Sequence, residues 1–307
     1  MADAAPRAGQ PVAYQNGRIV PAVGAGLPVD DHGVLFGAGF FETFRTSGGR
    51  PLLWDQHRRR LRQACAVARI QLPPAFLATD ETRVREAVTT LLERHGLADA
   101  VFRYTVTAGN LSVARDGAGY DQPAELLTLR PLPPAAPVEG VALRLLKLAR
   151  DNGEWLPRPK SLNYLNALLG AAELKPRAAA ASDEGLFLTR DGRHVVETAR
   201  QNVAWVKGGR WFFPDPALGA VAGTCWQWLL DSGIEAEPCR AGLEELIGAE
   251  AVVVMNSVRG VTPVRVLWDV PDRVVLGSWE SHAHPLVTAL GRRWSDLVDA
   301  AREGCTP

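Results

Sequence analysis

The stretch of sequence that decides the fold covers residues 160–202, KSLNYLNALLGAAELKPRAAAASDEGLFLTRDGRHVVETARQN. Its first half has the spacing of a helix that begins at Lys160, directly after a proline, and buries one apolar face. That face holds Leu162, Leu165, Leu168 and Ala171. Its second half predicts two strands joined by a turn at Asp191-Gly192, and the second strand delivers Glu197. One lysine and one carboxylate thus stand at the ends of predicted elements, which invites a chemical interpretation.

The composition limits the classes of function. A chain of 307 residues, 47% hydrophobic and 22% charged, is ordinary for globular proteins and long enough for two domains. Lys+Arg and Asp+Glu both number 34, so no excess charge favours nucleic acid or an anionic membrane as a partner. The four cysteines lack metal-ligand spacing, and we find no apolar signal core and no apolar run of membrane-spanning length. We therefore expect a cytoplasmic protein with reduced thiols and no metal site.

The first part of the chain predicts strands and helices that are segregated from one another. A hairpin is expected at Asn16-Gly17, a strand over residues 40–44, and helices over 55–70 and 81–95. Asp55 is the expected N-cap of the first of these helices. Two further strands begin near residues 101 and 124. This pattern indicates an α+β fold class.

A proline-rich segment over residues 131–137 indicates a linker, because proline cannot continue a sheet. We therefore place a small N-terminal α+β domain at 1–130, a linker at 131–140 and a larger domain at 141–307. The larger domain is expected to contain strands over 141–148 and 252–255. Its further helices are expected near 224–232 and from about 285 to 303.

Seven blocks of sequence, in order along the chain, resemble those of the fold-type IV pyridoxal-phosphate enzymes. The blocks are GVLFGAGFFETFR at Gly33, HRRRL at His57, KSLNYLN at Lys160, DEGLFL at Asp183, VVETARQN at Val195, GAVAGTC at Gly219 and NSVRGVTPV at Asn256. This group contains branched-chain aminotransferases, D-amino acid aminotransferases and aminodeoxychorismate lyases. The resemblance implies a homodimer whose chains have a small α+β domain and a larger domain with a β-barrel-like core.

The resemblance implies pyridoxal 5'-phosphate as the cofactor and assigns a role to three residues. Lys160 resembles the lysine that binds the cofactor aldehyde and moves protons. Glu197 resembles the glutamate beside the ring nitrogen, where a carboxylate favours the protonated ring. Arg60, the third residue after His57, resembles the arginine that binds the phosphate with a fork of donors. A basic run such as HRRRLR is, however, also typical of a solvated helix face.

Four further residues resemble cofactor contacts of the family. Thr224, at a predicted helix N-terminus, and Ser257 would bring hydroxyl groups to the phosphate. Either residue also fits the role of a plain cap. Asn202 and Tyr164 complete the expected cofactor site.

The expected substrate contacts are Arg103, in a strand, and Arg259, in a loop after a strand. An arginine paired with a local carboxylate is an equally good interpretation of Arg103. Two departures from the family pattern stand near these blocks. Trp226 occupies a position where many members have arginine, and ETARQN keeps Glu197 and Asn202 but lacks the family's glycine.

The resemblance favours a lyase that converts 4-amino-4-deoxychorismate to 4-aminobenzoate and pyruvate, because KSLN and FETFR lean towards the lyase branch. The alternative is an aminotransferase that acts on branched-chain or D-amino acids. A third hypothesis is a catalytically silent relative that binds a ligand or partner. For either enzyme, the partner is a small molecule with an amino group.

Overall fold

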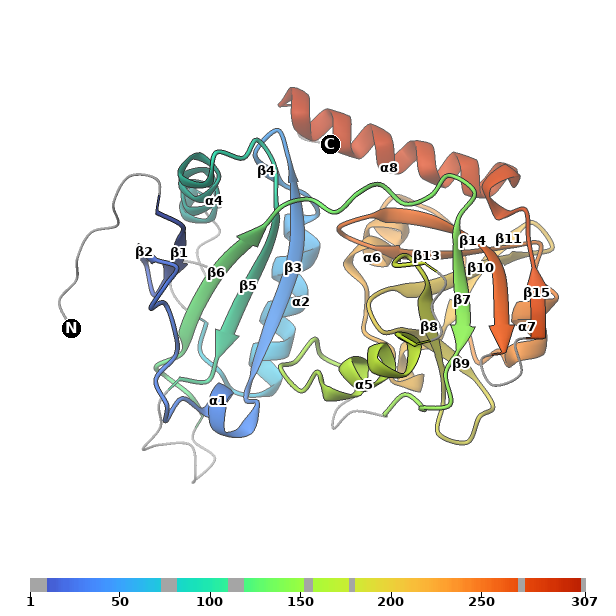
Figure 1. Ribbon diagram of the computed structural model, residues 1–307, viewed down its shortest axis with the longest axis horizontal. Coiled ribbons are helices and arrows are strands. Elements are labelled where there is room, and N and C mark those ends of the chain that lie inside the picture. Colours follow the sequence, from blue (N-terminus) through green and yellow to red (C-terminus); the bar gives the residue numbers. More distant parts are fainter. Residues whose placement is uncertain are drawn as a thin grey trace. The chain divides into compact units, whose positions relative to one another are not determined.

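The computed structural model describes residues 10–72, 82–109, 119–151, 157–176, 180–269 and 274–304, which form two compact units (Figure 1). Unit 1 comprises Met1–Pro133, Lys160–Asn163 and Leu297–Pro307, and unit 2 comprises Pro134–Pro159 and Tyr164–Asp296. None of the described helices combines the length and apolar character that a membrane span requires.

Unit 1 is built on one antiparallel sheet with the strand order β2-β1-β6-β5-β3-β4. The strands are β1 (Val12–Gln15), β2 (Arg18–Pro21), β3 (Gly39–Ser47), β4 (Arg50–Pro51), β5 (Val101–Thr107) and β6 (Ala124–Arg130). The predicted hairpin joins β1 to β2, and its turn residues Asn16 and Gly17 both have positive φ angles, of 47° and 83°. Such angles match the right-handed twist of the flanking strands.

One face of this sheet carries the core of unit 1. The alternation along β3 and β5 brings Phe44 and Phe102 to this face, where their rings stack with centroids 5.5 Å apart. The face is covered by α2 (Trp54–Val67) and α4 (Thr82–His95), which contribute Leu61 and Leu91 among others to the core. A short helix, α1 (His32–Phe36), precedes β3. The predicted α+β fold class is therefore confirmed.

The predicted start of the first long helix needs a correction. α2 begins at Trp54, and its N-cap is Leu53, whose φ of 56° lies in the left-handed region. Asp55 instead lies in the first helical turn, where its carboxylate forms an exposed ion pair with Arg58 at 3.1 Å. The second helix, α4, begins at Thr82 and ends at His95, as the apolar spacing and Gly96 predict.

Unit 2 is built on a nine-stranded sheet with the order β12-β11-β10-β13-β14-β7-β8-β9, to which β15 adds beside β14. The strands are β7 (Val141–Leu145), β8 (Glu184–Leu188), β9 (Val195–Thr198), β10 (Asn202–Lys207), β11 (Arg210–Pro214), β12 (Ala236–Cys239), β13 (Ala251–Asn256), β14 (Gly260–Asp269) and β15 (Val274–Ser278). β9, at one end of the path, also contacts β10 in the middle. The sheet thus curls, as expected for a β-barrel-like core.

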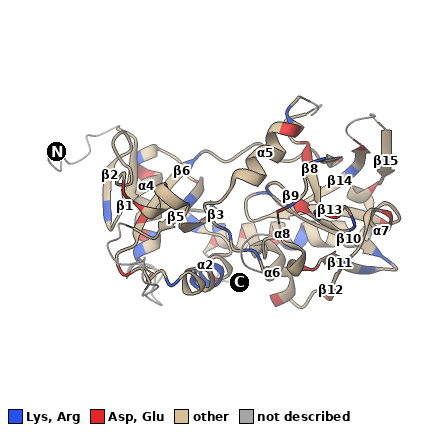
Figure 2. Cartoon of the chain, turned by 90° about the horizontal axis from the view of Figure 1, so that it is seen from below, with Lys and Arg blue, Asp and Glu red and all other residues tan. Residues whose placement is uncertain are grey.

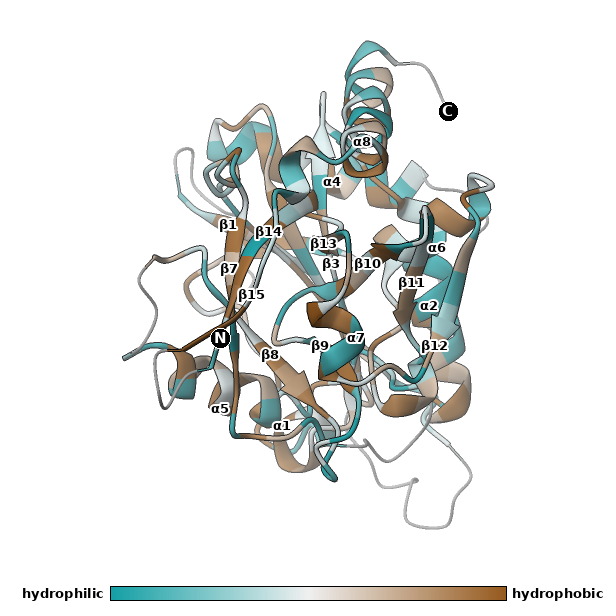
Figure 3. Cartoon of the chain, turned by 90° about the vertical axis from the view of Figure 1, so that its right-hand side faces the viewer, coloured by the Kyte–Doolittle hydropathy of each residue, from teal (hydrophilic) through white to brown (hydrophobic). Residues whose placement is uncertain are grey.

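The inner face of the curled sheet holds the core of unit 2. Val203, Val252, Val254 and Leu267 are at most 1% exposed and pack with Trp205 in one cluster. The strands that carry these residues contain runs of β-branched side chains, and Figure 3 shows their apolar character in brown. β7 ends three residues earlier than predicted, because the Glu173 carboxylate accepts from the main-chain N–H groups of Lys147 and Leu148, at 2.8 and 3.0 Å.

The remaining elements of unit 2 are helical. They are α5 (Leu165–Leu174), α6 (Thr224–Asp231), α7 (Leu243–Ile247) and the 3₁₀ turns η2 (Pro216–Leu218) and η3 (Ser281–Ala283). The last helix, α8 (Pro285–Glu303), has the predicted bounds, and its final residues from Leu297 onward belong to unit 1. The expected helix near residues 224–232 is also present.

The helix predicted to begin at Lys160 begins only at Leu165. Residues 160–163 are not helical, because their backbone pairs with β3: the Phe41 N–H donates to the Lys160 carbonyl at 3.0 Å, and Ser161 forms a bridge with Phe40. The buried face of α5 is also different from the predicted one, and it consists of Ala167, Gly170 and Leu174. A Cβ on Gly170 would lie 2.4 Å from the Phe187 ring, so only glycine permits this packing.

The division into domains at 1–130 and 141–307 stays a prediction. The compact units differ from these ranges in two segments, because Lys160–Asn163 and Leu297–Pro307 group with unit 1. The first of these segments carries the candidate lysine. The lysine is therefore attached, through its backbone, to the sheet of the N-terminal part of the chain.

Candidate active site

Lys160 lies against strand β3 of unit 1. The main-chain bond from Phe41 and the bridge between Ser161 and Phe40 fix the backbone at the lysine carbonyl and directly after it. Its side chain is half-buried, and Nζ lies 4.6 Å from the centroid of the Phe41 ring. A cation at this distance from an aromatic face is attracted by the ring. The local structure thus restricts where the amine is presented.

Arg60 comes from α2 of the same unit and faces inward, as predicted. Its Nε and Nη2 donate to the two carboxylate oxygens of Glu42, at 2.8 and 2.5 Å, and the same carboxylate contacts Nδ1 of His57 at 2.6 Å. The arginines of α2 appear as blue segments of this helix in Figure 2. The fork of Arg60 is therefore oriented before any ligand binds.

The Glu42 carboxyl is a buried group with a strongly shifted pKa. Burial alone would raise the pKa of Glu42, but the charge and hydrogen bonds of Arg60, together with His57, outweigh burial and lower it to about 2. Burial lowers the pKa of His57, against the opposing effect of Glu42. The side chain of Glu42 is 2% exposed, and that of His57 is fully buried. The site therefore carries a fixed carboxylate–arginine pair next to Phe41.

Arg103, the predicted substrate contact in β5, shares Phe41 with the lysine. Its guanidinium carbon lies 3.6 Å from the Phe41 centroid, and its Nε donates to Thr105 Oγ1 at 3.3 Å. The residue is exposed. Lys160, Arg60 and Arg103 are thus brought together around two consecutive residues of β3.

Glu197 lies in β9 of unit 2, 3% exposed, within a network of donors. Its Oε1 accepts from Arg150 Nη2 at 2.6 Å. Its Oε2 accepts from Asn202 Nδ2 at 3.2 Å and from the Val221 N–H at 3.1 Å. Asn202, predicted from the ETARQN block, therefore contacts Glu197 directly and also donates to the Val221 carbonyl at 2.9 Å.

Thr224 is the first residue of α6, as predicted, and is 4% exposed. Its N-cap is Gly223, where a Cβ would lie 1.8 Å from Asn202 Oδ1. The glycine therefore lets the helix N-terminus approach Asn202, and through it Glu197. A helix N-terminus carries free N–H groups and a partial positive charge. These features suit an anion.

Three further predicted residues belong to unit 2. Ser257 and Arg259 lie in the turn between β13 and β14, where Asn256 Oδ1 accepts from the Arg259 N–H at 2.8 Å. Ser257 is 6% exposed, and Arg259 is half-buried. Tyr164 precedes α5, and its hydroxyl donates to the Ala199 carbonyl at 2.9 Å. Unit 2 therefore assembles the predicted residues around β9, the start of α6 and the β13–β14 turn.

Sequence reasoning missed two residues of these clusters. Glu42 had a usable signal, because an acidic residue flanked by Phe40, Phe41 and Phe44 in a strand needs a buried partner. Arg150 had none, because it stands outside any element or motif and is joined to Glu197 only by the fold.

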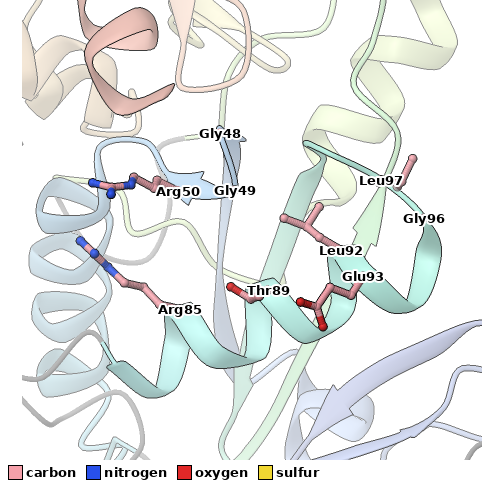
Figure 4. Close-up of a pocket in the computed structure, with 9 residues that line it drawn as sticks. All are labelled: Gly48, Gly49, Arg50, Arg85, Thr89, Leu92, Glu93, Gly96 and Leu97. Carbon is pink, nitrogen blue, oxygen red and sulfur yellow. The ribbon is translucent and has the colours of Figure 1, made fainter. Parts of the chain in front are cut away.

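A pocket of about 420 Å³ lies elsewhere in unit 1, beside the β3–β4 turn and α4 (Figure 4). It is lined by Gly48, Gly49, Arg50, Arg85, Thr89, Leu92, Glu93, Gly96 and Leu97. None of the predicted site residues is among them. We therefore do not connect this pocket with the candidate active site.

The family model for amino-transferase class IV matches residues 39–267. The chain belongs to the class IV aminotransferase family. The family consists of pyridoxal 5'-phosphate enzymes of fold type IV, so the predicted fold class, cofactor and enzyme class are confirmed.

Both a lyase and a putative aminotransferase match most of the chain. It is 31% identical over 258 residues to the aminodeoxychorismate lyase of Bacillus subtilis, which covers 81% of this chain and 84% of the lyase. It is 28% identical over 267 residues to a putative branched-chain-amino-acid aminotransferase of Methanocaldococcus jannaschii, with coverages of 85% and 88%. The chain therefore resembles both branches that the sequence blocks suggested.

Solved structures agree with this placement. The 4-amino-4-deoxychorismate lyase of Pseudomonas aeruginosa matches with a TM-score of 0.74 and 29% identity, and the match covers 92% of this chain and 98% of the lyase. The branched-chain amino acid aminotransferase of Escherichia coli matches with a TM-score of 0.73 at 21% identity, with coverages of 94% and 94%. The second match supports the fold alone.

The Glu42 cluster gives a prediction for stability against pH. The folded pKa of Glu42, about 2, lies below the unfolded value of 4.5, so its stabilisation is present above that unfolded value and is lost as the pH falls towards 2. Glu42→Gln should therefore lower the free energy of unfolding at neutral pH by about 3 kcal/mol. The difference from the wild type should shrink between about pH 4.5 and pH 2.

Urea unfolding of the cofactor-free protein at several pH values measures this difference. Glu93→Gln, at an exposed glutamate of the same unit, is the matched control and should change the free energy little. A difference between Glu42→Gln and wild type that stays constant down to about pH 2 contradicts the assignment.

Proposed function

We propose that this enzyme is a lyase that converts 4-amino-4-deoxychorismate to 4-aminobenzoate and pyruvate. The observation that carries the proposal is the 31% identity to the Bacillus subtilis lyase across 84% of that protein. The KSLNYLN and FETFR blocks, which lean towards the lyase branch, support it. A cytoplasmic location stays a prediction from the N-terminal sequence and the cysteine pattern.

The described residues fit pyridoxal 5'-phosphate. A buried carboxylate, Glu197, suits a protonated ring nitrogen, and its ion pair with Arg150 holds it in place. A helix N-terminus preceded by a glycine whose Cβ would clash with Asn202 Oδ1, Gly223 before Thr224, suits a phosphate. In this proposal Lys160 binds the aldehyde, Arg60, Thr224 and Ser257 bind the phosphate, and Asn202 and Tyr164 complete the contacts.

When bound, the cofactor supplies an electron-withdrawing ring that stabilises negative charge on the substrate. The substrate loses a ring proton, the carbon–oxygen bond to its enolpyruvyl group breaks, and the departing enolate gains a proton at carbon to become pyruvate. Lys160 Nζ is the proposed general base and acid for these transfers. Its fixed backbone and its place over Phe41 limit the positions that the amine can reach.

Arg103 and Arg259 are the proposed contacts for substrate carboxylates. The guanidinium carbon of Arg103 lies 3.6 Å from the centroid of the Phe41 ring, which Lys160 also contacts, and this supports a role beside the amine. Arg259 is half-buried, and its side chain has no ion pair with any described residue. Two separate cations suit a substrate with two carboxylates.

A product assay separates the lyase from an aminotransferase, the second candidate that the Methanocaldococcus relative supports. Purified protein loaded with cofactor should release equimolar 4-aminobenzoate and pyruvate from 4-amino-4-deoxychorismate. Incubation with branched-chain or D-amino acids and a keto acid should give little amino transfer. Robust amino transfer without 4-aminobenzoate would replace the lyase by the aminotransferase, and inactivity in both assays would favour the silent relative.

The phosphate role of Arg60 predicts a change in cofactor affinity. Arg60→Ala removes charge-assisted hydrogen bonds and should weaken cofactor binding by about 10- to 100-fold. Arg59→Ala is the matched control, because Arg59 is the exposed neighbour on α2 and should leave the affinity unchanged. Equilibrium titration of the cofactor-free protein measures both values, and thermal unfolding shows whether each variant is folded. A folded Arg60→Ala protein with wild-type affinity would remove Arg60 from the site.

A homodimer is part of the proposal and would cover apolar residues of two short helices. On α1, Val34, Leu35 and Phe36 are 56%, 53% and 65% exposed. On α5, Leu165, Leu168 and Leu169 are 66%, 58% and 49% exposed, and Figure 3 shows the apolar colour of this helix. Contiguous exposed apolar residues of this kind mark protein interfaces.

Leu168→Glu should therefore convert a dimer into monomers, because it would bury an unpaired charge in the interface. Val138→Glu is the control, at an apolar residue that is 85% exposed but lies on neither helix. Sedimentation of both variants at micromolar concentration decides the question. A monomeric wild type, or a Leu168→Glu dimer as stable as the wild type, speaks against this interface.

A further inference from the structure

The hydrogen bonds of Glu197 leave one oxygen with spare capacity. An ionised carboxylate has about four acceptor sites, two on each oxygen. Oε2 accepts from Asn202 Nδ2 and the Val221 N–H, so both of its sites are used. Among the described residues, Oε1 accepts only from Arg150 Nη2, at 2.6 Å. A further donor would therefore bind at Oε1, beside the Arg150 guanidinium.

Arg150 is held in place by contacts on several sides. It is 4% exposed, and its Nη1 donates to Asn166 Oδ1 at 2.9 Å. The Asn166 amide in turn donates to the Ala149 carbonyl at 3.0 Å, which fixes the orientation of that side chain. The guanidinium carbon also lies 5.2 Å from the Phe187 centroid. A buried arginine with these partners cannot swing away from Oε1 without losing its ion pair.

Two other ionisable side chains lie within electrostatic reach of this pair. Arg158, 8% exposed, has a pKa lowered to about 10 by burial and by the charge of Arg150, with Glu197 and Tyr164 opposing. Tyr164 donates its hydroxyl to a main-chain carbonyl. Among the described residues, Arg150 and Arg158 thus place two positive charges within electrostatic reach of the Glu197 carboxylate.

We propose that Arg150 is a positioning residue for the cofactor: it shares Glu197 Oε1 with the ring nitrogen of pyridoxal phosphate and weakens the nitrogen's hold on its proton. The inference rests on the proposed function, which places Glu197 at the ring. A carboxylate alone favours the protonated ring, and a guanidinium bound to the same oxygen opposes that effect. At the separations that one shared oxygen allows, this opposition corresponds to about one pKa unit or more.

A pH titration of cofactor labelled with ¹⁵N at the ring nitrogen tests the inference, because the ¹⁵N chemical shift reports the proton directly. Arg150→Met keeps the length of the side chain and removes the charge, and it should raise the pKa of the ring nitrogen by about one unit or more. Arg150→Lys keeps the charge and should titrate close to the wild type. Arg144→Met, which breaks the Arg144–Asp183 ion pair in the same unit, is the matched control and should change nothing.

Glu197→Gln distinguishes failure of this inference from failure of the proposed function. Under the proposed function it lowers the pKa of the ring nitrogen, so a wild-type titration in Glu197→Gln overturns the placement of Glu197 and the inference with it. A lowered pKa in Glu197→Gln together with a wild-type titration in folded Arg150→Met overturns the inference alone. An equal shift in Arg150→Lys and Arg150→Met also overturns it, because charge would then not be the cause. Should Arg150→Met not fold, Arg150→Gln carries the same expectation.

Discussion

Main-chain pairing between the segment of Lys160 and strand β3 is the interaction on which the rest of the structure's chemistry depends. The hydrogen bond from the Phe41 N–H and the bridge at Ser161 are made by backbone atoms, so they fix the direction of the chain at the lysine carbonyl and directly after it. The ammonium consequently lies over Phe41, and the next residue of the same strand, Glu42, holds Arg60. One strand therefore sets the positions of a candidate nucleophile and a candidate phosphate ligand.

Two of the buried glutamates place fixed charges beside the candidate site residues. Glu42 and Glu197 are each at most 3% exposed, and each forms an ion pair with an arginine. Burial of an unpaired carboxylate would be costly, whereas pairs with further hydrogen bonds are tolerated in the folded chain. Because the donors are in place without a ligand, binding need not reorganise them, which is the condition for electrostatic preorganisation.

The sequence predicted the elements that local chemistry determines. The hairpin at Asn16-Gly17 and the bounds of α8 follow from turn residues and apolar spacing within each segment. The start of α5 was wrong because residues 160–163 pair with a strand more than a hundred positions earlier, which periodicity cannot reveal. Leu168 was expected in the core and is 58% exposed, because apolar spacing identifies a face but not what covers it.

The same distinction applies to the candidate site. Motif order identified Lys160, Arg60 and Glu197 as residues to examine, and the structure of each unit shows their immediate partners. Arg150 could not be predicted in this way, because its link to Glu197 spans 47 positions and leaves no trace in spacing. Partners that meet only through the fold have to be read from the structure.

The central claim is that Lys160 is the amine that binds the cofactor. Borohydride reduction of the cofactor-loaded protein, followed by proteolysis and mass spectrometry, identifies the labelled lysine directly. The account predicts the label on Lys160 alone. Label on Lys147, Lys175 or Lys207 instead, or no covalent label on a protein that has bound the cofactor, would contradict it.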